Sequence, residues 1–153
     1  MRPWLCMLAL TMPLLAHADP IKTLAANDVP SLVAPPAHGT RVLAFWALDC
    51  AYCESNLQAL DRLHQQHPEV QVIAVATDSM TEAPTISARL KAAGVDHLPA
   101  YAYAEASPER INFLIDPKWG GETPRTLVIR ADGTREGISG ELTPQRLGTI
   151  ARP

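Results

Sequence analysis

Residues 45–53 read Phe-Trp-Ala-Leu-Asp-Cys-Ala-Tyr-Cys and join two differently patterned stretches of the chain. The preceding run, residues 41–47, is almost continuously apolar, which is typical of a strand buried on both faces. After the cysteines, leucines recur at helical spacing until Pro68, so we expect a helix that ends near His67. The sequence therefore places Cys50 and Cys53 where a buried strand gives way to a helix.

The position and spacing of the two cysteines favour a redox-active pair over a disulfide that only stabilises the fold. A cysteine at the start of a helix meets free backbone N–H groups and the positive end of the helix dipole, and both favour the nucleophilic thiolate. Cys53 follows Cys50 by one helical turn, so it can resolve a mixed disulfide formed on Cys50. A disulfide between them would enclose only two residues, and such a short loop stabilises a fold little.

The remaining elements alternate before they end in a hairpin. Strands are expected at residues 70–76, 98–104, 126–130 and 134–139, and helices at residues 81–93 and 108–115 and from residue 143 onward. Alternating strands and helices pair the early strands in parallel, whereas the Asp132-Gly133 turn adds an antiparallel hairpin. We predict an α/β fold with a mixed central sheet, helices on both faces, a β-hairpin edge and a C-terminal helix. The expected core comprises Val42, Leu43, Phe45, Trp46, Val72, Ile73, Val75, Leu127, Val128 and Ile129.

The first residues resemble an export signal. Arg2 precedes an apolar stretch, residues 4–15, that is too short to span a bilayer as a helix. Ala16-His17-Ala18 then fits a signal peptidase site, so we predict a signal peptide over residues 1–18, with a retained anchor helix as the alternative. Residues 19–40, rich in proline, are expected to be a loosely ordered lead-in, and residues 41–153 the folded domain. The expected location is the periplasm or the outside of the cell.

Charge and the numbers of cysteine and histidine residues limit the classes of function that the chain can have. Cleavage near Ala18 removes Cys6 and Arg2, and leaves two cysteines and a formal charge of −4 from 12 Lys and Arg against 16 Asp and Glu. This mildly acidic charge, without a basic patch, lacks the electrostatic signature of nucleic-acid binding. We expect no cofactor and a monomer. A zinc site would need further thiolates or clustered histidines, and His38, His64, His67 and His97 are not spaced as ligands with the cysteines. The open alternatives are a copper-binding chaperone, with Met80 as the single thioether of the mature chain, and a redox-sensing adaptor.

Two stretches resemble a known family. Residues 45–53 resemble the Phe-Trp-Ala-x-x-Cys-x-x-Cys signature of thioredoxin-fold proteins, and residues 122–129 resemble their Thr-Pro-x-x-x-x-Ile stretch. With the signal peptide, the chain looks most like the TlpA-type periplasmic thiol-disulfide oxidoreductases.

The resemblance implies a thioredoxin-like fold in which Pro124 is cis and lies beside the reactive disulfide. It also implies that the Thr123 backbone lines the groove and pairs with an extended client. Trp46 is expected to be a core residue as well as a wall of the site. The family relationship further implies exported client proteins with thiols or disulfides and a membrane thiol reductase as the electron donor.

Three residues depart from the family pattern. Asp49 replaces the common aromatic residue before the first cysteine, Tyr52 replaces the common proline before the second, and Ala44 stands where thioredoxins carry a buried carboxylate. The carboxylates of Asp49 and Glu54 oppose a thiolate nearby and should raise the pKa of Cys50. Because a strong oxidant needs a stabilised thiolate, we expect a reductase or a mild exchanger.

Overall fold

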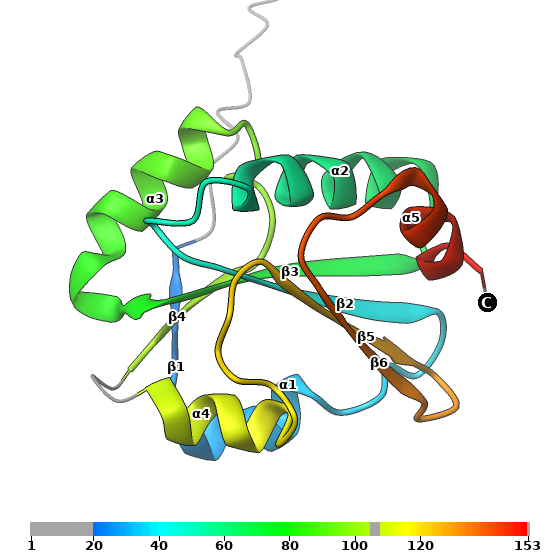
Figure 1. Ribbon diagram of the computed structural model, residues 1–153, viewed down its shortest axis with the longest axis horizontal. Coiled ribbons are helices and arrows are strands. Elements are labelled where there is room, and N and C mark those ends of the chain that lie inside the picture. Colours follow the sequence, from blue (N-terminus) through cyan, green and yellow to red (C-terminus); the bar gives the residue numbers. More distant parts are fainter. Residues whose placement is uncertain (1–19, 105–107, 153) are drawn as a thin grey trace, which may run out of the picture.

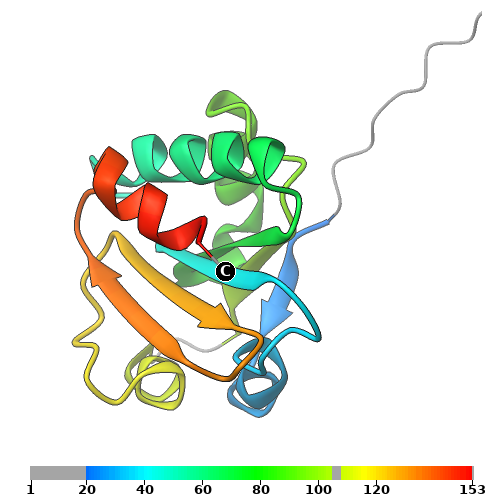
Figure 2. The same ribbon diagram turned by 90° about the vertical axis from the view of Figure 1, so that its right-hand side faces the viewer.

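The computed structural model describes residues 20–104 and 108–152, which build a mixed six-stranded sheet with helices on both faces (Figures 1 and 2). The strands, in the spatial order β1-β4-β3-β2-β5-β6, are β1 (Lys22–Leu24), β4 (Ala100–Tyr103), β3 (Val70–Ser79), β2 (Thr40–Trp46), β5 (Arg125–Arg130) and β6 (Arg135–Ser139). The helices are α1 (Val29–Leu32), α2 (Cys53–Gln66), α3 (Ala83–Ala92), α4 (Pro108–Ile115) and α5 (Pro144–Ile150), with 3₁₀ turns η1 (Ala26–Asp28) and η2 (Met80–Glu82).

Strand directions follow the connections. β1, β4, β3 and β2 pair in parallel, because helices carry the chain back between them. β5 pairs antiparallel with β2, and β6 pairs antiparallel with β5 to form the edge hairpin. The predicted mixed sheet, edge hairpin and C-terminal helix are confirmed.

The central strand β2 contributes side chains to both layers of the core. Val42, Ala44 and Trp46 face the cluster under α2, α3 and α5, whereas Leu43 and Phe45 face the cluster under α1 and α4. Figure 1 shows the two layers above and below the sheet. Of the ten predicted core residues, nine are buried, and Ile73 is partly buried at the border of the second cluster.

The prediction of a loosely ordered lead-in over residues 19–40 is wrong for the described part of this segment. β1 pairs with β4, and Leu24, Val29 and Leu32 are buried in the second cluster. This element is hard to predict from sequence, because a three-residue strand shows no periodicity. Pro30 lies in the first turn of α1, a helix position where the lack of an N–H costs nothing.

The folded domain therefore begins before residue 41. The predicted signal peptide and its cleavage site lie outside the described residues. Within residues 20–104 and 108–152, none of the helices combines the length and apolar character that a membrane crossing requires.

Candidate active site

The two cysteines form a disulfide just after the carboxyl end of β2, with their Cα atoms 5.6 Å apart. α2 begins at Cys53, so Cys50 lies in the turn that leads into this helix. The two residues differ in access: Cys50 is partly exposed, whereas Cys53 is 2% exposed. A client sulfur approaching from solvent thus meets Cys50 first.

Residues 47–53, here called the reactive turn, are held mainly by backbone contacts. The Cys50 N–H donates to the Ala47 carbonyl at 3.2 Å, and the Cys53 N–H donates to the Cys50 carbonyl at 3.5 Å. One distant side chain takes part, since Asp78 Oδ2 accepts a hydrogen bond from the Leu48 N–H at 2.9 Å. Asp78 was not predicted from the sequence, although its place near the carboxyl end of a parallel strand beside β2 was a usable signal.

A small cleft opens beside the disulfide. Its volume is about 10 Å³, close to the space of a single water molecule, and both cysteines line it. Glu54 on α2 and Arg89 on α3 are the charged residues on its walls, and both side chains are exposed. Arg89 was not foreseen, because in the sequence it looks like any polar residue on the outer face of a helix.

The side chains expected to support the site lie in different surroundings. Trp46 lines the cleft and is 3% exposed, and its indole N–H has no hydrogen-bond partner among the described residues. Asp49 is exposed, and Tyr52, between the cysteines, is 70% exposed. The reactive turn therefore presents an acidic side chain and an aromatic ring to solvent.

Residues 116–125, here called the proline loop, enter β5 next to this turn. The Thr123–Pro124 peptide bond is cis, and Pro124 is buried. Arg125 pairs with Phe45 in the antiparallel register, which places the preceding Pro124 alongside the end of β2. A hydrogen-bonded bridge also joins Pro124 to α2.

This bridge runs through the segment after β6. The Gly140 N–H donates to the Pro124 carbonyl at 2.9 Å, and Asn56 Nδ2 donates to the Gly140 carbonyl at 3.0 Å. Asn56 Oδ1 also accepts from the Leu142 N–H at 3.0 Å. Asn56 lies on α2 one turn beyond the cysteines and is buried, so it ties the proline loop to the helix that carries Cys53.

Charged side chains fasten the proline loop from outside. Arg125 donates to Asp116 Oδ2 at 2.6 Å and to Ser139 Oγ at 2.7 Å. Ser139 Oγ in turn donates to Glu122 Oε1 at 2.6 Å, and this hydrogen bond is the main reason that the pKa of Glu122 lies below its usual value. The Trp119 indole N–H donates to the Glu122 carbonyl at 2.9 Å. The loop is therefore fixed at both ends and at its middle.

Trp119 and Gly137 accommodate the proline loop and the contacts of Arg125 with Asp116 and Ser139, here called the Arg125 clamp. Trp119 is 5% exposed, and its ring packs against Phe45 with the centroids 4.7 Å apart. Gly137 on β6 faces the Arg125 guanidinium, and a Cβ at this position would collide with it. Glycine at position 137 thus leaves the path by which Arg125 reaches Ser139.

The possible metal ligands are dispersed. His64 Nδ1 lies 2.8 Å from the Val70 carbonyl oxygen, and His97 Nε2 lies 2.7 Å from Asp61 Oδ1. Within the part of the chain that the structure describes, no three His, Cys, Asp or Glu side chains gather as a metal site. Met80 is partly buried against the same core cluster as Cys50.

Comparison with known proteins defines the fold. No protein-family model and no curated protein sequence matches the chain. Among solved structures, it is similar to a secreted Mycobacterium tuberculosis disulfide oxidoreductase described as homologous to E. coli DsbE, with 18% identity over 74% of this chain and 80% of that one and a TM-score of 0.56.

Two other solved structures are comparably similar. A thioredoxin-related protein from Neisseria meningitidis is 22% identical over 74% of this chain and 83% of its own, with a TM-score of 0.58. A thiol:disulfide interchange protein of the thioredoxin family from Chlorobium tepidum is 17% identical over 89% of this chain and 97% of its own, with a TM-score of 0.57. The chain has a thioredoxin-like fold, as the sequence resemblance implied.

Proposed function

We propose that the protein is an exported thiol-disulfide oxidoreductase that reduces or gently exchanges disulfides in client proteins. The observation that carries this proposal is the disulfide between a partly exposed Cys50 and a buried Cys53 at the start of α2. The solved structures that share the fold include proteins described as disulfide oxidoreductases, which supports the same chemistry.

The reduced protein reduces a client disulfide in two thiol-disulfide exchange steps. The Cys50 thiolate attacks a client disulfide, forms a mixed disulfide with one client sulfur and releases the other as a thiolate. Cys53 then loses its proton and attacks the Cys50 sulfur, which releases the second client thiolate and restores the Cys50–Cys53 disulfide. Two electrons pass from the protein to the client, and a membrane thiol reductase would restore the dithiol.

The direction of electron flow is inferred from charge. Asp49 and Glu54 place two carboxylates on or beside the reactive turn against one cation, Arg89, on the cleft wall, and this excess of negative charge disfavours accumulation of the Cys50 thiolate. A protein whose reduced form is not strongly stabilised is a poor oxidant, so reduction or mild exchange fits better than disulfide donation.

Trapping tests the proposal. In cells, Cys53→Ala should accumulate Cys50 in mixed disulfides with exported proteins, and the double variant Cys50→Ala, Cys53→Ala should capture none. The purified protein should reduce insulin, and its redox equilibrium with glutathione should be far less oxidising than that of the strongest periplasmic oxidants. Tight stoichiometric copper binding by the reduced protein, without insulin reduction, would overturn the proposal in favour of the copper-binding alternative.

A further inference from the structure

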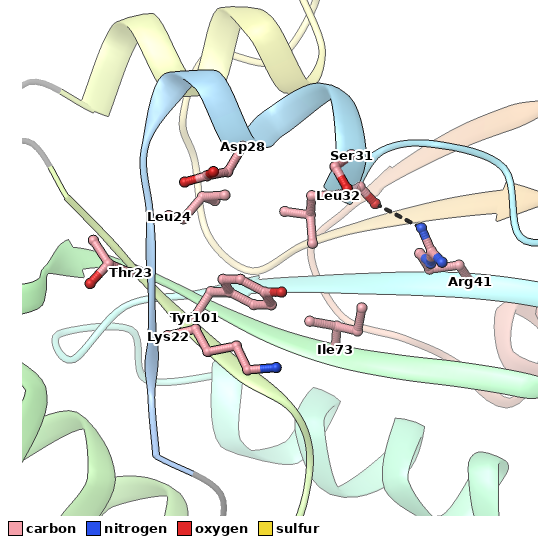
Figure 3. A pocket seen from close by; sticks show the side chains of 9 residues that line it. All are labelled: Lys22, Thr23, Leu24, Asp28, Ser31, Leu32, Arg41, Ile73 and Tyr101. Carbon is pink, nitrogen blue, oxygen red and sulfur yellow. Dashed lines mark hydrogen bonds between the residues drawn. The ribbon is translucent and has the colours of Figure 1, made fainter.

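A second cavity lies at the opposite end of the sheet from the disulfide. It has a volume of about 390 Å³, within the range of small-molecule pockets, and we call it the β1 cavity. Its lining residues are Lys22, Thr23, Leu24, Asp28, Ser31, Leu32, Arg41, Ile73 and Tyr101 (Figure 3). Arg41 lies near the amino end of β2, whereas Cys50 follows the carboxyl end of the same strand.

The floor of the β1 cavity crosses four strands. Lys22 on β1 lies directly opposite Tyr101 on β4. Ile73 on β3 lies opposite Leu43, two residues beyond Arg41 on the same face of β2. Figure 3 shows Lys22 and Arg41 on opposite sides of the hollow, with Tyr101 and Ile73 between them. An apolar and aromatic floor is thus flanked by two cations.

Neither cation forms an ion pair with any residue that the structure describes. The ion pairs among the described residues involve other side chains. Lys22 Nζ lies 6.0 Å from the centroid of the Tyr101 ring, at the outer limit of a cation–π contact. The cavity lining therefore carries two cations and one carboxylate, Asp28, and so has a net positive charge in a chain whose net charge is negative.

Arg41 fixes a positive charge at the far wall of the β1 cavity. Its Nη1 donates to the carbonyls of Leu32 at 3.2 Å and Ala34 at 2.9 Å, which fixes the guanidinium at the end of α1. Its Nε is buried and has no hydrogen-bond partner among the described residues. The guanidinium is therefore held in place and contributes positive charge to the cavity, not a donor that a ligand could reach.

We propose that the β1 cavity binds a small monoanion with an aromatic or branched apolar body. The anionic group would be held by Lys22, the body would cover Tyr101 and Ile73, and Arg41 would add positive charge at the far wall. A polyanion fits less well, because the carboxylate of Asp28 stands on the wall and the floor is apolar. This site does not depend on the proposed redox function.

The test uses a pair of fluorescent probes that differ in charge alone. The oxidised full chain is titrated with 8-anilino-1-naphthalenesulfonate and with N-phenyl-1-naphthylamine, the same aromatic body without the sulfonate. We expect saturable one-to-one binding of the sulfonate, weakened by high salt, and clearly weaker binding of the neutral probe. Equal binding of the two probes, or no saturable binding of the sulfonate, would overturn the proposal.

Variants and amide shifts locate the bound probe. Lys22→Gln should weaken sulfonate binding about two- to five-fold, and Ser31→Glu should weaken it further by adding a carboxylate to the exposed wall. Lys91→Gln, on α3 and outside the cavity, is the matched control and should change nothing. Amide shifts should cluster at residues 22–24 and at Ile73 and Tyr101. Shifts centred on the exposed Phe113 and Leu114 of α4, or on the disulfide cleft, would refute the assignment.

Discussion

The reactive turn and the proline loop meet at the carboxyl end of β2 but are held in different ways. The reactive turn relies on backbone hydrogen bonds between near neighbours, on the nearby Ser55, whose Oγ donates to the Tyr52 carbonyl, and on one distant side chain, Asp78. The proline loop is fastened by the clamp of Arg125 and by the indole of Trp119. In the proposed reaction, the turn whose disulfide opens has few long-range contacts to restrain it. The loop proposed to receive a client is fixed before binding, which would lower the ordering cost of binding.

Removing the clamp should give the largest effect. Arg125→Met leaves the partly buried Asp116 without its charged partner, so we expect the free energy of unfolding to fall by about 1–3 kcal/mol. Client binding should suffer more than chemistry, seen as a raised KM for insulin with a smaller change in kcat. Arg62→Met, at an exposed position on α2, is the control. Equal stability of both variants would show that the loop does not need the clamp.

The distant side-chain anchor of the reactive turn should matter less. Asp78→Ala removes the acceptor of the Leu48 N–H, with an expected loss of about 1 kcal/mol. The more telling measurement is amide exchange, which should accelerate at Leu48 while the amides of β5 stay protected. Asp96→Ala, in the turn before β4, serves as the control. Unchanged exchange at Leu48 would mean that the turn is held without Asp78.

The charge on the cleft wall should have a smaller effect still. Arg89→Gln removes a cation beside the cysteines, so the reduced protein should hold less thiolate and Cys50 should react with iodoacetamide about two- to five-fold more slowly at neutral pH. High salt should reduce this difference, because an exposed charge is screened. Lys91→Gln, on the same helix but away from the cleft, should react as the wild type does. A salt-independent loss would point to a structural defect.

The smallest expected effect concerns pH. The Ser139 hydrogen bond holds the pKa of Glu122 below its usual value, so this contribution to stability is present above the ordinary pKa and is lost as the pH falls through the lowered one. Ser139→Ala should move the NMR titration midpoint of Glu122 upward, toward the ordinary value. An unchanged midpoint would assign the shift to Arg125 instead.

Much of the fold was readable because its strands are long and apolar. Residues 41–47 and 70–76 lie in the centre of the sheet, where burial on both faces leaves a continuous apolar run. β1 escaped notice because three residues carry no pattern, and its place depends on β4, which lies far along the chain. Length and burial therefore decided which strands the sequence could reveal.

The site, too, contains residues that the sequence reveals and residues that only the fold reveals. The cysteines, and the stretch around Pro124 through its resemblance, were visible because local sequence marks them. Arg89, Asp78 and the clamp around Arg125 were not, since each is an ordinary polar residue until the fold brings a distant partner to it. Asp78 reaches back 30 residues to Leu48, and Ser139 lies 14 residues beyond Arg125.

The late pairing of β1 also bears on how the chain is made. Lys22 leaves the ribosome long before its partner Tyr101, and until then β1 has no neighbouring strand and Leu24 has no core to enter. An unpaired strand invites association with other chains, although a length of three residues limits that hazard. A shortened chain that starts at Arg41 would transfer the same exposure permanently to β4, so recombinant versions should retain everything from Pro20 onward.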